Sequence, residues 1–207
     1  KMPFLLGENI VSLKNAKDLG EIGTRFIEKR RPSLEAQLAN MADGLAYNNH
    51  DIDDGLRSGL LDLQLMSELP VFGEHLHAVA RKYPGIDEQR KASEAIRRTV
   101  NSFVIDLTQE SARLIQDANP SSLDGVRSGP TLICFSEEME LKHREVQQYL
   151  YRNLYRHYKV QRMADKAKRV VRGLFKAFNE DVGLLPPRYQ IQAKRMPREP
   201  LPTTSLV

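Results

Sequence analysis

The spacing of apolar residues predicts helices along most of this chain. Between residues 86 and 118 the sequence has no glycine or proline, and its apolar residues recur at intervals of three and four. This period places them on one face of an α-helix, so we expect a single long amphipathic helix there. By the same reasoning, helices are expected over residues 33–51, 56–69, 71–83, 136–158 and 161–179. The predicted fold is an all-α helical bundle.

Segments rich in helix breakers separate or follow these helices. Residues 119–130 (NPSSLDGVRSGP) should form a loop, because their Ser, Gly, Pro and Asp residues favour turns. Residues 131–135 (TLICF) are the only segment with a strand-like pattern. We therefore expect a partly irregular N-terminal lead-in (1–32), a helical domain (33–180) and an extended or disordered Pro-rich tail (181–207).

The composition is that of an ordinary soluble globular protein, with 41% hydrophobic and 28% charged residues. No apolar run approaches the roughly 20 residues that cross a bilayer, so no membrane partner is expected. Cys134 is the only cysteine, which excludes an internal disulfide and suits a reducing compartment. We expect a cytoplasmic protein.

Charge is distributed unevenly along the chain. Residues 142–207 hold 15 Lys/Arg and 5 Asp/Glu, whereas residues 1–141 hold 16 and 22. A basic C-terminal third indicates an anionic partner, such as nucleotide phosphates, single-stranded DNA or an acidic protein surface. The alternative is an ordinary solvated helix face, and the charge count alone does not choose between them.

The helix expected over 33–51 carries the most informative side chains. Asp43, Tyr47 and Asp51 are spaced by four and so share one helix face, which either contacts a ligand or is an acidic surface facing solvent. The dipeptide His50-Asp51 suggests a metal-binding pair. However, adjacent residues of a helix diverge by about 100°, so these two cannot readily chelate one ion.

Two stretches of this chain carry distinctive motifs. The first is residues 41–59 (MADGLAYNNHDIDDGLRSG), preceded by residues 33–37 (SLEAQ). The second is residues 154–163 (LYRHYKVQRM), about a hundred residues downstream. Both resemble the deoxynucleoside triphosphate triphosphohydrolases of the HD-domain superfamily, in particular the bacterial dGTP triphosphohydrolase-like members. With the helical pattern, the resemblance covers residues 33–179 and implies the C-terminal part of an HD-domain phosphohydrolase.

The resemblance assigns roles to individual residues. Asp43 would be the last ligand of a divalent metal, Mg²⁺ or Mn²⁺ first and Fe or Zn as alternatives. The pair His50-Asp51 would not be the metal pair of the superfamily. Tyr47 and Asp51 would face the bound deoxynucleotide, and Tyr155 would lie beside its sugar, although helical spacing among the nearby tyrosines also fits packing.

The implied reaction is hydrolysis of a deoxynucleoside triphosphate to the deoxynucleoside and tripolyphosphate, by a protein that forms homo-oligomers. The other metal ligands of the family, a His and a His-Asp pair, precede its last Asp, but the first histidine here is His50. We therefore expect a C-terminal portion of the enzyme, with no catalytic residue of its own and inactive alone. The alternative is a non-catalytic helical module that binds nucleic acid, nucleotide or a partner subunit through its basic C-terminal half.

Overall fold

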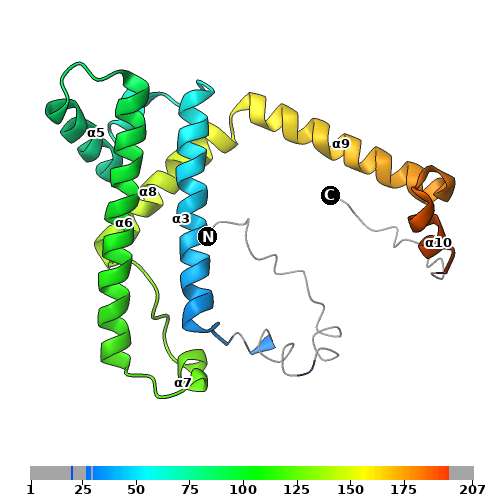
Figure 1. The fold of residues 1–207 in the computed structure, drawn as a ribbon, viewed down its shortest axis with the longest axis horizontal. Coiled ribbons are helices and arrows are strands. Elements are labelled where there is room, and N and C mark those ends of the chain that lie inside the picture. The colour runs from blue at the N-terminus through cyan, green and yellow to red at the C-terminus, as the bar shows by residue number, and fades with distance from the viewer. Residues whose placement is uncertain (1–19, 21–26, 29, 196–207) are drawn as a thin grey trace. The chain divides into compact units, whose positions relative to one another are not determined.

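The computed structural model describes residues 20, 27, 28 and 30–195. This part of the chain is mostly helical and contains no strand, which confirms the all-α prediction (Figure 1). The elements are α3 (Leu34–Arg57), α4 (Leu63–Met66), α5 (Pro70–Lys82), α6 (Glu88–Ala118), α7 (Leu123–Ser128), α8 (Glu137–Leu150), the π-helix η1 (Tyr151–Tyr155), α9 (Tyr158–Glu180), the 3₁₀-helix η2 (Val182–Leu184) and α10 (Pro187–Arg195).

The chain divides into two compact units, Lys1–Leu154 and Tyr155–Val207. This boundary falls inside the helical domain predicted over 33–180, whose bounds stay a prediction. The predicted lead-in over 1–32 lies almost entirely outside the described residues. Each unit is described by itself below.

The first unit is built on α6. Helix α5 packs along α6, and α3 runs beside α6 in the opposite direction (Figure 1). Helix α8 contacts α3 as well. The largest side chains enclosed between these elements are Phe72, Ile52, Met66, Leu132, Leu150, Val79, Val146 and Thr99. Burial of this apolar surface is the main force that holds the helices together.

The helices begin near the residues where the sequence pattern predicts them, whereas several connections between helices differ from the prediction. Ser33 caps α3, its Oγ accepting from the N–H of Ala36 at 3.4 Å, and Ser136 caps α8 through the N–H of Met139. The long helix predicted over 86–118 is present as α6, after the cap residue Asp87. Such caps satisfy backbone donors that have no partner inside the helix.

The helix predicted over residues 56–69 is wrong. Helix α3 continues only to Arg57, and a turn follows in which Gly59 has φ of 66°. The N–H groups of Leu60 and Leu61 both donate to the carbonyl of Gly55, at 2.9 Å each. Asp62 then caps α4, which has only 4 residues. Leu61 of the turn and Met66 of the short α4 are the buried residues of this apolar run, and periodicity alone does not distinguish this arrangement from one continuous helix.

Three other local predictions are corrected. The loop expected over 119–130 contains α7, which Ser122 caps through the N–H of Gly125. Residues 131–135 form no strand, since two of their N–H groups donate to the Gln37 side chain instead of a neighbouring strand. The tail contains α10, which Pro187 can begin because its missing N–H would have no helical partner anyway. Pro197, Pro200 and Pro202 lie outside the described residues.

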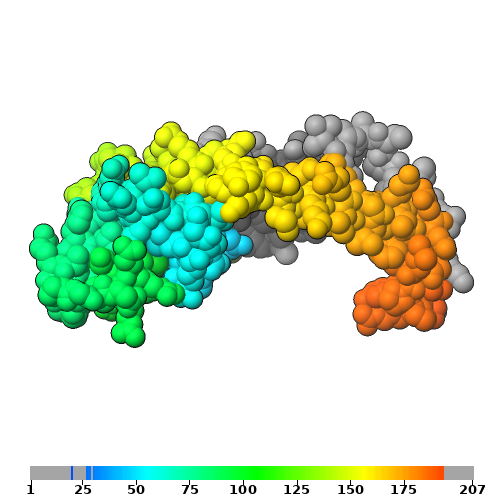
Figure 2. Space-filling view, turned by 90° about the horizontal axis from the view of Figure 1, so that it is seen from above, coloured from blue at the N-terminus to red at the C-terminus, as the bar shows by residue number. Residues whose placement is uncertain are grey.

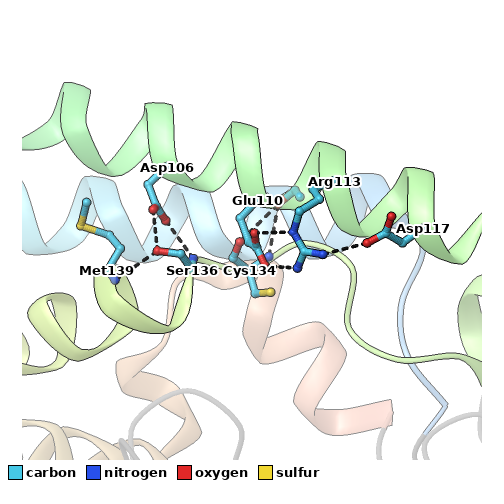
Figure 3. Close-up of polar contacts among 8 residues, drawn as sticks. Asp106, Glu110, Arg113, Asp117, Cys134, Ser136 and Met139 are labelled. Atoms are coloured by element: carbon cyan, nitrogen blue, oxygen red, sulfur yellow. Dashed lines mark hydrogen bonds and ion pairs between the residues drawn. The ribbon is translucent and has the colours of Figure 1, made fainter.

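Helix α6 also fixes the start of α8 (Figure 3). The Asp106 carboxylate accepts from the Ser136 N–H at 2.9 Å and from its hydroxyl at 2.6 Å. One turn further on, the Ser111 hydroxyl accepts from the N–H of Cys134 at 3.2 Å. These contacts join residues 23 and 30 positions apart in the sequence. They hold the N-terminus of α8 at a defined place on α6.

The second unit contains α9, η2 and α10. Helix α9 has no buried residue; its atoms are coloured yellow to orange in Figure 2. The helix predicted over 136–158 is shorter than expected: α8 ends at Leu150, η1 follows, and His157 caps α9. None of the described helices is long and apolar enough to cross a membrane.

Candidate functional site

Helix α3 holds Asp43, Tyr47 and Asp51 along one side, which we call the α3 face. Because each residue turns a helix by about 100°, this face lies roughly 100° around the axis from the buried side of α3. The buried side consists of Gln37, Leu45, Asn48, Ile52 and Gly55. The direction in which the α3 face points is thus determined by which side of the helix packs against the core.

The α3 face presents an aromatic ring between two carboxylates. Tyr47 is 65% exposed, Asp43 is exposed and Asp51 is half-buried. A phenol can pack against a flat or apolar group and donate a hydrogen bond from its O–H. Carboxylates accept hydrogen bonds from hydroxyl groups or bind cations. The face can therefore bind a small polar molecule that carries hydroxyl groups.

The residues around Asp43 do not by themselves form a metal centre. Within the part of the chain that the structure describes, no group of three or more His, Cys, Asp and Glu side chains could hold an ion. A single carboxylate leaves most coordination positions of a divalent metal unfilled. His50 is exposed and precedes the half-buried Asp51 on a regular helix. The metal role of Asp43 stays a prediction that requires ligands from elsewhere.

The second stretch of the resemblance has a local structural role. Tyr155 is half-buried at the end of η1, and its backbone carbonyl accepts from the Gln161 side chain at 2.6 Å. The His157 Nδ1 accepts from the N–H of Lys159 at 3.4 Å and caps α9. Tyr155 belongs to the second unit and the α3 face to the first. Its contact with a sugar stays a prediction.

Sequence reasoning missed a buried polar cluster behind the α3 face. Asn48 of α3 and His143 of α8 are 6% and 8% exposed, and the Asn48 Nδ2 lies 2.9 Å from the His143 Nε2. Burial lowers the pKa of His143. A signal was present: Asn48 occupies a position of the apolar stripe of α3, and His143 shares its helix face with Val146 and Leu150. Polar residues at such positions normally have a buried partner.

Two other histidines lie on α5. His77 is exposed. His75 is half-buried, and its Nε2 lies 2.8 Å from the Ser102 Oγ of α6. Burial lowers the pKa of His75 as well. The two residues are two positions apart on α5, so only one can face α6.

Helix α9 separates apolar and basic side chains. Its polar side carries Lys159, Arg162, Lys166, Lys168, Arg169, Arg172 and Lys176, with Asp165 and Glu180 as the acidic residues. Its other side exposes at least half of each of Met163, Val170, Val171, Leu174 and Phe175. Seven of the 15 Lys and Arg residues of the basic C-terminal third therefore lie along this one helix.

Comparisons with known proteins agree with these observations. A family described as a phosphohydrolase-associated domain matches residues 133–201. Several curated proteins named deoxyguanosinetriphosphate triphosphohydrolase-like protein are similar to most of the chain. The one from Thiobacillus denitrificans is 48% identical over 179 residues, which are 86% of this chain and 48% of that protein. The one from Bordetella pertussis is 50% identical over 179 residues, 86% of this chain and 47% of that protein.

The chain spans about half the length of the curated relatives that it matches. The matched 179 residues cover 86% of this chain. The chain is therefore similar over most of its length to deoxyguanosinetriphosphate triphosphohydrolase-like proteins, and residues 133–201 match a phosphohydrolase-associated domain.

Proposed function

We propose that the chain is the C-terminal portion of a metal-dependent deoxynucleoside triphosphate triphosphohydrolase, and that the α3 face forms one wall of its substrate site. The exposed ring of Tyr47 between two carboxylates carries this proposal. The names of the relatives support the reaction class. The parent enzyme would convert dGTP or another dNTP and water to the deoxynucleoside and tripolyphosphate, in the cytoplasm and as a homo-oligomer.

Each side chain of the α3 face would contact a different part of the substrate or its metal. Tyr47 would pack against the deoxyribose and donate its O–H to a phosphate or sugar oxygen. Asp51 would accept from the 3′-hydroxyl, and a ribose 2′-hydroxyl would crowd this wall. Asp43 would supply one anionic oxygen to a divalent metal whose charge favours the triphosphate, with Mg²⁺ or Mn²⁺ as the first choice.

Binding of dGTP to the isolated chain tests the proposal. We expect dGTP to shift the amide NMR signals around Tyr47 and Asp51. The dissociation constant for GTP, from the same titration, should be at least about tenfold higher, because one unfavourable contact with its 2′-hydroxyl costs about 1–3 kcal/mol. Asp51→Asn should weaken dGTP binding, since a carboxylate accepts more strongly than an amide. Asp53→Asn is the matched control, because this carboxylate lies about 160° around α3 from Asp51 and pairs with Arg57. Equal responses to dGTP and GTP would contradict selection by the α3 face.

The basic side of α9 favours a second candidate function. Seven Lys and Arg residues against two acidic ones along a single helix would attract a nucleic-acid backbone. In this alternative the chain is a non-catalytic module that binds single-stranded DNA, a nucleotide or a partner subunit. An electrostatic interface of this kind has a diagnostic dependence on salt.

Single-stranded DNA binding should weaken steeply with salt if this alternative holds. We expect the double variant Arg162→Ala/Lys166→Ala to reduce the slope of log K against log salt by about 1.4, or about 0.7 for each lost phosphate contact. Arg81→Ala, an exposed cation on α5, should leave the slope unchanged. Fluorescence anisotropy of a labelled oligonucleotide gives both slopes. Equal slopes for the double variant and the parent chain would exclude α9 as the binding surface.

A further inference from the structure

A hydrogen bond joins α3 to α8 behind the α3 face. The Asn48 Nδ2 and the His143 Nε2 are 2.9 Å apart, although the residues are 95 positions apart in the sequence. An amide nitrogen can only donate, so Nε2 accepts and the ring proton resides on Nδ1. Both side chains are more than nine-tenths buried. Losing His143 would remove the acceptor of the buried Asn48 amide.

The His143 ring is held rigidly from several sides. Its centroid lies 5.3 Å from that of Phe103 of α6, edge to face, and 5.1 Å from that of Phe135. The Gln147 amide lies 3.4 Å from the same Nε2. Since α6 also anchors the start of α8, the imidazole is a fixed point on the framework formed by α6 and α8. Burial lowers the pKa of His143 and so favours the neutral ring that an acceptor must have. The charge of Arg144 acts in the same direction, and that of Glu140 opposes it.

The hydrogen bond between Asn48 and His143 restricts the rotation of α3 about its own axis. Apolar contacts along a helix are not directional, so they tolerate some roll of the helix. A hydrogen bond is directional and weakens steeply when its geometry changes. Asn48 is next to Tyr47 and one turn before Asp51, so a roll that breaks its bond also turns the α3 face. The bond therefore couples the direction of this face to α8.

We propose that His143 is a positioning residue: through Asn48 it fixes the rotation of α3, and so the direction in which Tyr47 and Asp51 point. Its consequence for substrate binding rests on the proposed function, but the positioning itself does not. A residue that only fills the core would affect stability without controlling the α3 face. The experiment has to separate these two roles.

The test uses the 207-residue chain with 3-fluorotyrosine incorporated, and the ¹⁹F signal of Tyr47 is assigned by its loss in Tyr47→Phe. His143→Phe keeps a ring of similar size but removes Nε2. The double variant Asn48→Leu/His143→Phe replaces both partners by apolar groups, which restores most of the stability without restoring the bond. His75→Phe is the matched control, since it removes a similar His–Ser contact between α5 and α6.

In both variants that lack His143 we expect the Tyr47 signal to shift or broaden and the affinity for dGTP to fall about fivefold or more, as for the loss of one hydrogen bond. His75→Phe should change neither. Recovery of the wild-type signal and affinity in the stable double variant would overturn the proposal and leave a purely structural role. If the wild-type chain binds no dGTP, the proposed function fails, and the ¹⁹F signal alone still decides the positioning.

Asn48→Asp keeps the proposal testable should the other variants not fold. A carboxylate can only accept, so the His143 Nε2 must become the donor and the ring must change its tautomer. We expect the ¹⁵N signals of Nδ1 and Nε2 to exchange their protonated and unprotonated shifts, with the Tyr47 signal kept near its wild-type position. Unchanged ring ¹⁵N signals at a pH where the new carboxyl group is ionised would show that the bond is absent in solution and would overturn the proposal.

Discussion

The purified 207-residue chain, supplied with dGTP and Mg²⁺ or Mn²⁺, is expected to release no tripolyphosphate above the rate without protein. The described residues offer one candidate metal ligand, Asp43, and no group of three that could hold an ion. Enzymes accelerate reactions by about 10⁶-fold or more, so an incomplete site leaves turnover below detection. ³¹P NMR or ion chromatography of the products measures it directly.

Asp43→Asn, prepared in parallel, controls for contaminating enzymes. Equal turnover in the two preparations would come from a contaminating enzyme and not from this chain. Turnover that is present in the wild-type chain and lost in the variant would contradict the prediction, because the chain would then hold a complete catalytic site. This outcome would leave the reaction class intact and overturn only the inference that the chain is a partial site.

Gly73→Ala is expected to destabilise the first unit by about 3 kcal/mol or more, the upper range for overpacked sites. Gly73 is buried in α5, and a Cβ there would lie 2.0 Å from the carbonyl oxygen of Ser67 and 2.8 Å from its carbon. Backbone atoms at a helix junction cannot move aside as a flexible side chain can. The free energy of unfolding from urea denaturation measures the loss.

Gly44→Ala is the matched control, because this glycine is also helical but a Cβ there meets nothing within 4 Å. It should stabilise the chain by about 0.5–1 kcal/mol, the usual advantage of alanine over glycine in a helix. The two substitutions are chemically identical and are expected to have opposite signs. A Gly73→Ala variant as stable as the wild-type chain would show that the α4–α5 junction can separate without cost.

The helices could be predicted wherever a single period continued for several turns. The helix expected over 86–118 is present as α6, and Ser33 and Ser136 cap α3 and α8 at the expected starts. These features could be predicted because periodicity and capping depend only on residues that are close in the sequence. The helix over residues 56–69 was predicted wrongly, because the N–H groups of Leu60 and Leu61 bond to Gly55 in a turn after α3. The plausible strand over residues 131–135 is absent, because two of its N–H groups bond to Gln37, at least 95 positions away, and no local pattern identifies such a partner.

The candidate site shows the same division. The sequence by itself determined that Asp43, Tyr47 and Asp51 share one side of α3, since residues spaced by four are neighbours on any helix. Only the tertiary structure decided which side of α3 is buried and that Asn48 meets His143. Helical geometry extends over a few residues, whereas this contact joins positions 95 residues apart and depends on how α3, α6 and α8 pack.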